Sequence, residues 1–100
     1  MTQHDFTALY KHYPAIIKRL PATFGSHQFI LALAHQHQKL YIEALYAYRH
    51  NPAPFQAVHT VLVRRLRSHP ELISYTPGSN VPSTDIFGHA SECAEWRKCS

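Results

Sequence analysis

Apolar residues recur every three or four positions through most of residues 1–70, which is the spacing of one face of an α-helix. Over residues 2–20 this pattern predicts an amphipathic helix that ends before Pro21. Thr2 and Asp5 resemble a capping box at its start, with Asp in place of Glu. Pro14 removes one helical hydrogen bond, so we expect a kink or two short helices there. The apolar positions are Phe6, Leu9, Tyr10, Tyr13, Ile17 and Leu20.

A second helical stretch covers residues 27–50, which contain neither glycine nor proline. It follows a connector at residues 22–25. Ser26 is suited to be its N-cap, because a serine hydroxyl can accept a hydrogen bond from a free amide of the next turn. The polar residues 35–39 interrupt the apolar pattern. The pattern therefore predicts either one long helix or two helices joined by a tight turn.

A third helix is predicted over residues 54–67. Residues 51–54 read Asn-Pro-Ala-Pro, and proline is common at the first position of a helix. His69 and Pro70 end the helix. Its buried stripe is expected to consist of Phe55, Val58, Leu62 and Leu66.

The remaining residues have a different pattern. Two short strands are predicted at residues 72–75 and 85–88, and the turn-forming residues 76–80 follow the first of them. Ser91 is expected to cap a final turn of helix that carries Cys93, Ala94 and Trp96.

These elements predict a single domain over residues 1–100, mainly α-helical, with a helical body at 2–69 and an irregular or hairpin segment at 70–100. The expected architecture is a three-helix core with a small β-hairpin near the C-terminus. A plain helical bundle is the alternative.

The most informative polar residues lie on the predicted helix at 54–67, opposite its buried stripe. Gln56, Thr60, Arg64 and Arg67 share this side. Glutamine and arginine make paired hydrogen bonds to adenine and guanine edges. Arg65 and Lys39 are candidates for phosphate contacts. A solvated face of an ordinary surface helix is the alternative interpretation. Under the nucleic-acid interpretation, the predicted site consists of Gln56, Thr60, Arg64, Arg67, Arg65 and Lys39.

Charge is unevenly distributed along the chain, whose formal net charge is +4. Residues 1–70 hold eight Lys or Arg and two acids, a balance of +6, whereas residues 71–100 hold two and four, a balance of −2. A basic body favours a polyanionic partner, and double-stranded DNA is the candidate. Ordinary scatter of charge is the alternative.

The layout resembles a winged helix, a helix-turn-helix variant with three helices, the third for recognition, followed by a β-hairpin wing. The resemblance implies that Gln56, Thr60 and Arg64 occupy the outward positions of a recognition helix. The chain departs from the pattern in two ways: no glycine marks a turn between the second and third helices, and residues 74–86 contain no Lys or Arg. The resemblance rests on Ser26, Phe29, Ile30, Tyr41, Leu45, Pro54, Phe55, Val58, Leu62, Leu66, Leu72, Ile73, Ile86 and Phe87.

Metal binding and catalysis have little support. His35 and His37 are two positions apart, whereas a helical zinc pair is spaced by four. His89, Cys93 and Cys99 match no zinc spacing. No GxSxG, Walker or Rossmann motif is present. We therefore expect no metal, no cofactor, no catalytic residue and no enzymatic activity.

A protein-interaction or homodimerisation module is the alternative function. The aromatic residues exceed what a small core is expected to bury, and exposed aromatics favour protein contacts. Homodimerisation through the helix at 27–50 is one form of this hypothesis. The aromatic residues concerned are Tyr10, Tyr13, Tyr41, Tyr46, Tyr48 and Trp96.

The expected location is the cytoplasm. No run approaches the roughly 20 apolar residues of a membrane span, so no membrane partner is expected. The polar start of the chain lacks the layout of a secretory signal. Cys93 and Cys99 are expected to be free thiols.

Overall fold

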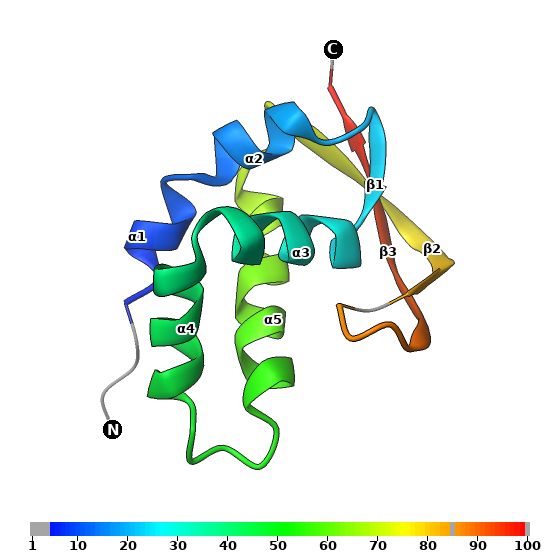
Figure 1. The fold of residues 1–100 in the computed structure, drawn as a ribbon. Coiled ribbons are helices and arrows are strands. Elements are labelled where there is room, and N and C mark those ends of the chain that lie inside the picture. Colours follow the sequence, from blue (N-terminus) through cyan, green and yellow to red (C-terminus); the bar gives the residue numbers. More distant parts are fainter. Residues whose placement is uncertain (1–4, 85, 100) are drawn as a thin grey trace.

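The computed structural model describes residues 5–84 and 86–99, except for the side chains of residues 76–81. Helices form one part of the described chain, and a three-stranded antiparallel sheet lies beside them (Figure 1). The helices are α1 (Thr7–Tyr10), α2 (Tyr13–Arg19), α3 (Ser26–Gln36), α4 (Gln38–Ala47), α5 (Pro54–Arg65) and the 3-10 helix η1 (Leu66–Ser68). The strands are β1 (Thr23–Gly25), β2 (Ile73–Thr84) and β3 (Ala90–Lys98).

The N-terminal helical stretch is divided into α1 and α2, so the alternative of two short helices is confirmed. Pro14 is in the first turn of α2, where a missing N–H removes no helical hydrogen bond. The Asp5 carboxylate accepts a hydrogen bond from the Thr7 amide at 2.9 Å. The capping box with Thr2 lies outside the described residues.

The second stretch is also divided, which confirms the two-helix alternative. α3 ends at His37, whose φ of −133° and ψ of 57° are not helical, and α4 follows directly. The prediction of Ser26 as N-cap is wrong, because Gly25 is at that position and Ser26 is already the first residue of α3. The Ser26 hydroxyl instead accepts a hydrogen bond from Trp96 Nε1 at 2.9 Å.

The two helix breaks contact each other through histidine rings. His12 is between α1 and α2, and its ring stacks on that of His37 with centroids 3.7 Å apart. Burial, followed by the nearby charges of His12 and Arg19, lowers the pKa of His37 from 6.5. The lowered pKa favours the uncharged imidazole of His37.

The sheet differs most from the sequence prediction. Its order is β1-β3-β2, and β1 is in the segment predicted as a connector. The predicted turn at 76–80 is within β2, at a register shift where β2 advances five residues from Tyr75 to Asn80 while β3 advances two. The residues of that segment form an irregularity in a strand rather than its end.

The C-terminal residues also fold differently from the prediction. Residues 86–88 belong to the connection between β2 and β3 rather than to a strand, and Gly88 has a φ of 84°, which favours glycine. The predicted helical turn at Ser91 is wrong, because these residues form β3. Cys93 and Trp96 are buried three positions apart, a spacing that also suits a helix. Pairing with β1 and β2 on both sides holds β3 extended.

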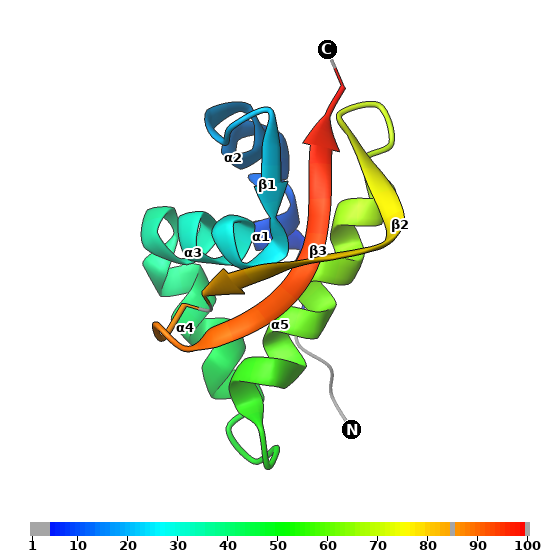
Figure 2. The same cartoon turned by 90° about the vertical axis from the view of Figure 1, so that its right-hand side faces the viewer.

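The core lies where the helices pack against one another and against the sheet (Figure 2). The helical body and the C-terminal hairpin are present as expected, but β1 makes the sheet larger than a hairpin, and the fold is mixed α and β. Leu62 is completely buried at its centre. The core contains Phe6, Leu9, Tyr13, Ile16, Ile17, Phe24, Phe29, Ile30, Leu33, Ala34, Tyr41, Ala44, Val58, Leu62, Leu66, Ile73 and Trp96.

β3 is also attached to the end of α2. The Lys98 ammonium group donates hydrogen bonds to the carbonyl oxygens of Lys18, at 3.1 Å, and Leu20, at 2.9 Å. A cation at a helix C-terminus interacts favourably with the exposed carbonyl groups there. The Lys98 amide also donates to the Ala22 carbonyl at 2.7 Å.

Candidate functional site

The local sequence explains where α5 begins and ends. Pro54 is in its first turn, and the Asn51 side-chain oxygen accepts a hydrogen bond from the Ala53 amide at 2.8 Å just before it. The α-helix ends at Arg65, two residues earlier than predicted, because the final turn tightens into η1. Val58, Leu62 and Leu66 are completely buried, so one side of this element is fixed against the core.

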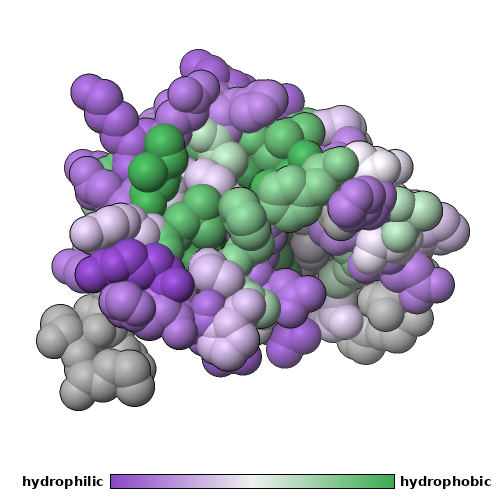
Figure 3. Space-filling view, turned by 60° about the horizontal axis from the view of Figure 1, so that its bottom comes forward, coloured by the Kyte–Doolittle hydropathy of each residue, from purple (hydrophilic) through white to green (hydrophobic). Residues whose placement is uncertain are grey.

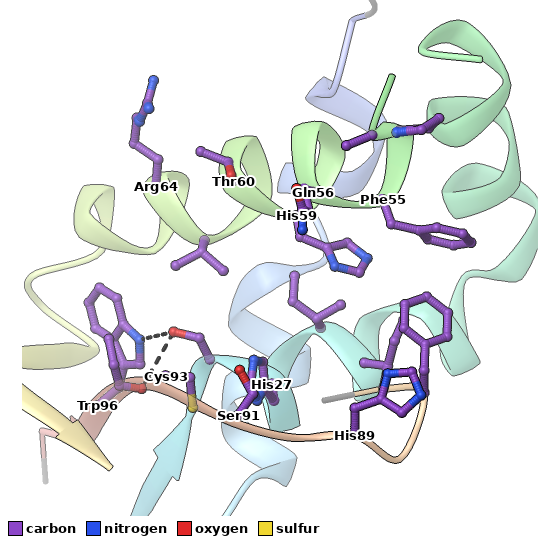
Figure 4. Close-up of a pocket in the computed structure, with 18 of the residues that line it drawn as sticks. His27, Phe55, Gln56, His59, Thr60, Arg64, His89, Ser91, Cys93 and Trp96 are labelled. Atoms are coloured by element: carbon purple, nitrogen blue, oxygen red, sulfur yellow. Dashed lines mark hydrogen bonds between the residues drawn. The ribbon is translucent and has the colours of Figure 1, made fainter. Parts of the chain in front are cut away.

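The other side of α5 carries the polar residues that were predicted as the site. Gln56, Thr60 and Arg64 are exposed, and each is four residues from the next. Figure 4 shows Thr60 and Arg64 on the side of α5 that is turned away from β3. Arg67 is exposed in η1. The structure thus brings these four residues together along one helical element.

The two remaining predicted residues lie elsewhere. The Arg65 guanidinium group is 4.5 Å from the centre of the Tyr10 ring, so it contacts the N-terminal part of the chain. Lys39 is exposed in α4. Neither residue lines the groove beside α5. They are therefore not part of the same local surface as Gln56 and Arg64.

A groove of about 990 Å³ separates α5 from the β2–β3 hairpin. Gln56, Thr60 and Arg64 border it on the α5 side (Figure 4), and so does Arg67 of η1. Apolar and aromatic side chains from α3, α5 and the hairpin form much of the remaining lining. They are Ile30, Phe55, Val63, Tyr75, Ile86, Phe87, Ala94 and Trp96.

Phe55 is not part of the buried stripe predicted for α5, because 42% of its surface is exposed. Its ring instead meets that of Phe87 edge to face, with centroids 4.7 Å apart. Phe87 follows β2 in the connection of the hairpin, so the tip of the hairpin packs on the first turn of α5. This contact closes one end of the groove.

Histidines add hydrogen-bonding groups to the lining. The His27 ring is 3.1 Å from the Ser83 hydroxyl, measured from Nδ1. His59 Nε2 is 2.6 Å from the Tyr41 hydroxyl, as expected for a packed and hydrogen-bonded histidine. Burial raises the pKa of Tyr41 to about 12, so Tyr41 stays protonated near neutral pH.

The described residues that line the groove include no Asp or Glu. They include two arginines, Arg64 and Arg67, and three histidines, His27, His59 and His89. Arginine side chains repel a cationic ligand and attract an anionic one. This lining therefore favours an anionic ligand.

An apolar patch that shares Phe55 and Phe87 with the groove lies over α3, α4 and the first turn of α5 (Figure 3). Leu31, Ile42, Phe55 and Phe87 are 41%, 61%, 42% and 51% exposed. They line a shallow hollow of about 280 Å³ together with residues of α3, α4 and the hairpin. Contiguous exposed apolar surface is typical of contact sites.

The aromatic residues cited for a protein-interaction surface are mostly buried, which corrects the premise of that hypothesis. Tyr13, Tyr41 and Trp96 are core residues, whereas Tyr46 is 64% exposed. Tyr10 and Tyr48 are half-buried against the core. The small domain accommodates so many rings because they pack on one another, as Tyr13 does on Phe29 with centroids 4.7 Å apart.

The described part of the chain contains no group of three metal-ligating side chains. Cys93 is a buried free thiol and Cys99 an exposed one, as predicted. None of the helices seen in the described residues combines the length and apolar character needed to span a bilayer.

Several groove residues were not predicted as site residues from the sequence. Tyr75, Trp96 and Phe87 belong to the hairpin or its connection, whose course the apolar pattern did not predict. Their role becomes visible only when the hairpin is placed beside α5. Comparisons of the chain with protein-family models, curated proteins and solved structures found no match.

Proposed function

We propose that this chain is a small non-enzymatic nucleic-acid-binding domain of the winged-helix type, in which α5 enters the major groove of double-stranded DNA. The observation that carries the proposal is the exposed row of Gln56, Thr60 and Arg64 on three successive turns of α5. These side chains can reach base edges while Val58 and Leu62 hold the helix against the core.

The arrangement of elements supports the winged-helix interpretation. If α1–α2 and α3–α4 are each counted as one interrupted helix, α5 is the third helix and the β2–β3 hairpin follows it as the wing. The hairpin flanks α5 across the groove, with Phe87 on Phe55. Because residues 74–86 contain no Lys or Arg, this wing would position α5 rather than hold phosphate.

The charge distribution is consistent with a polyanionic partner. Arg64 and Arg67 border the groove, whose described lining contains no acid. A surface with an excess of positive charge attracts phosphate over several ångströms. This attraction weakens as salt screens the charges. Arg65 and Lys39 face other parts of the surface and would contribute only to the general attraction.

The test is titration of labelled random-sequence and genomic duplexes by fluorescence anisotropy at low and at physiological salt. We expect sequence-independent binding with a Kd on the order of 10⁻⁴–10⁻⁶ M at physiological salt, becoming tighter as salt is lowered. The absence of binding at low salt and high micromolar protein would contradict the proposal.

The matched variants are the double substitution Gln56→Ala with Arg64→Ala, and Arg19→Ala as control. Arg19 is also exposed and its loss removes the same charge, but it is at the end of α2 and donates a hydrogen bond to Gln36 at 2.8 Å. The double variant should lose most of its duplex binding while the control keeps most of it. Equal loss in both would leave only a general charge effect and would reject α5 as the interface.

A second candidate function is self-association through the apolar patch of Leu31, Ile42, Phe55 and Phe87. The exposure of these four large side chains favours it, and Leu31 and Ile42 lie within the 27–50 segment predicted as a dimerisation surface. Light scattering after size exclusion should then give a dimer mass that Ile42→Glu reduces to that of the monomer. A monomer at every concentration would exclude self-association.

A further inference from the structure

The groove between α5 and the hairpin has the size of a ligand site. Its volume of about 990 Å³ is at the upper end of the range of roughly 300–1,000 Å³ for small-molecule pockets. It extends along α5 and η1 from Phe55 to Arg67, a helical length of about 18 Å. Figure 4 shows Phe55 and His89 at one end and Trp96 toward the other. A molecule with two or three fused or linked rings fits this length.

One end of the groove combines a cation with aromatic faces. The Arg67 guanidinium group lies 4.9 Å from the centre of the Tyr75 ring. The Tyr75 ring in turn packs on Trp96, with centroids 5.1 Å apart. Trp96 is held in place by its hydrogen bond to Ser26 at 2.9 Å. An anionic group bound here would meet Arg67, and a flat ring attached to it would meet the Tyr75 ring that Trp96 supports.

The rest of the lining suits the body of such a ligand. Val63 and Ile86 offer accessible apolar surface, and the hydroxyl group of Ser91 borders it. The described lining includes no carboxylate that would repel an anion or pair with Arg67. Apolar walls with a few convergent polar groups are the usual composition of a small-molecule site.

We propose that this groove binds a small aromatic anion, with its acidic group on Arg67 and its rings against Tyr75 and the apolar wall. Charge complementarity selects the anion, and the length and aromatic lining of the groove select a flat body. The site is on the inner side of α5, whereas Gln56, Thr60 and Arg64 are on its outer border. Arg67 is the residue that this site shares with the proposed DNA surface, and dye binding measured without DNA tests the groove separately.

The probe is 8-anilinonaphthalene-1-sulfonate, and N-phenyl-1-naphthylamine serves as its neutral counterpart with the same rings. Trp96 is the single tryptophan of the chain, so energy transfer from Trp96 reports dye bound to the domain, and the variants below locate that dye in the groove. We expect saturable one-to-one binding of the sulfonate, at least tenfold tighter than that of the neutral dye.

Two variants locate the site. Arg67→Ala should weaken sulfonate binding at least tenfold and leave the neutral dye unaffected, and Arg67→Lys should restore part of the loss. Ser91→Phe places a large side chain on the β3 side of the groove and should weaken both dyes. Because Ser91 is exposed, this substitution tests the site independently of Arg67.

Two matched controls exclude other surfaces. Arg49→Ala removes an exposed arginine that also lies over a tyrosine, 4.0 Å from the Tyr46 ring, but is outside the groove. Ile42→Ala alters the apolar patch. Both should bind the sulfonate as the parent chain does. Equal affinity for the two dyes, equal loss in Arg49→Ala and Arg67→Ala, or loss in Ile42→Ala would each overturn the proposal.

Discussion

The two sides of α5 differ in burial, because one side packs in the core and the other faces the groove and solvent. On the buried side, Val58 and Leu62 are completely enclosed, and the Leu62 carbonyl accepts a hydrogen bond from the Tyr13 hydroxyl at 2.6 Å. On the open side, Gln56 and Arg64 border a groove without close packing. The difference teaches that changes on the buried side should alter stability, whereas changes on the open side should alter binding.

Leu62→Ala should have the largest effect. Its side chain is completely buried, so truncation removes apolar contacts and leaves a cavity. We expect a loss of about 2–5 kcal/mol in the free energy of unfolding, measured by urea denaturation. Thr60→Ala, on the open side of the same helix, is the control and should change stability by less than about 0.5 kcal/mol. Similar losses in both would remove the distinction between the two sides.

Arg64→Ala and Arg67→Ala should sharpen the comparison from the open side. If Arg64 reads a base edge, its loss should cost about 1–3 kcal/mol in duplex binding and relax preference at one base pair. An Arg67 that meets phosphate should weaken all duplexes alike and flatten the salt dependence. Thermal melting should show both variants folded, since exposed charges contribute little to stability. If a variant is unfolded, the arginine that it lacks is required for stability, and its loss of binding is not evidence for a DNA contact.

Tyr13→Phe tests the hydrogen bond that links α2 to the buried side of α5. The Tyr13 hydroxyl is buried, and burial raises its pKa well above 10, so it remains a donor at ordinary pH. Removing it should cost about 0.5–1.5 kcal/mol by denaturant unfolding, because the phenyl ring keeps its packing. Tyr46→Phe, at an exposed tyrosine, should be nearly neutral.

The smallest expected effect concerns pH and the His12–His37 stack. The pKa of His37 is lowered in the folded state, so the unfolded chain binds the proton more readily. The stability that uncharged His37 contributes is fully present above pH 6.5. It is lost as the pH falls from 6.5 through the lower pKa of the folded state. His37→Gln should therefore lose less stability between pH 7.5 and 5.5 than the parent chain. His35→Gln, at an exposed position of α3, is the control, and an equal change in both would contradict this origin.

The helical body was predictable because its pattern has a strong local cause. Pro14 and Pro54 mark helix starts through covalent geometry, and the apolar spacing identified Leu62 at the centre of the core. The sequence left open whether residues 27–50 form one helix. At the break, the His37 ring stacks on that of His12, a residue far away in the sequence, and the helical period does not reveal such a contact.

The hairpin was not predictable in the same way. The spacing of Cys93 and Trp96 suits a helix, and only pairing with β1 and β2 makes these residues a strand. Phe55 was assigned to the core because the helical period places it there, but the hairpin tip reaches it through Phe87 instead. The exposed row on α5 could be found from the helical period, whereas the groove depends on long-range placement of the hairpin.

The position of β3 at the centre of the sheet has a consequence for how the domain is made. β1 and β2 are synthesised before β3, but neither pairs with the other, and each must wait for residues 90–98. Their edges stay unpaired, and the face of Tyr75 that packs on Trp96 stays uncovered during that time. Pairings between distant segments form slowly, and exposed strand edges promote aggregation. Ribosome-bound chains that stop before residue 90 should therefore carry a partly folded helical body that recruits chaperones, and release of β3 should complete folding in one step.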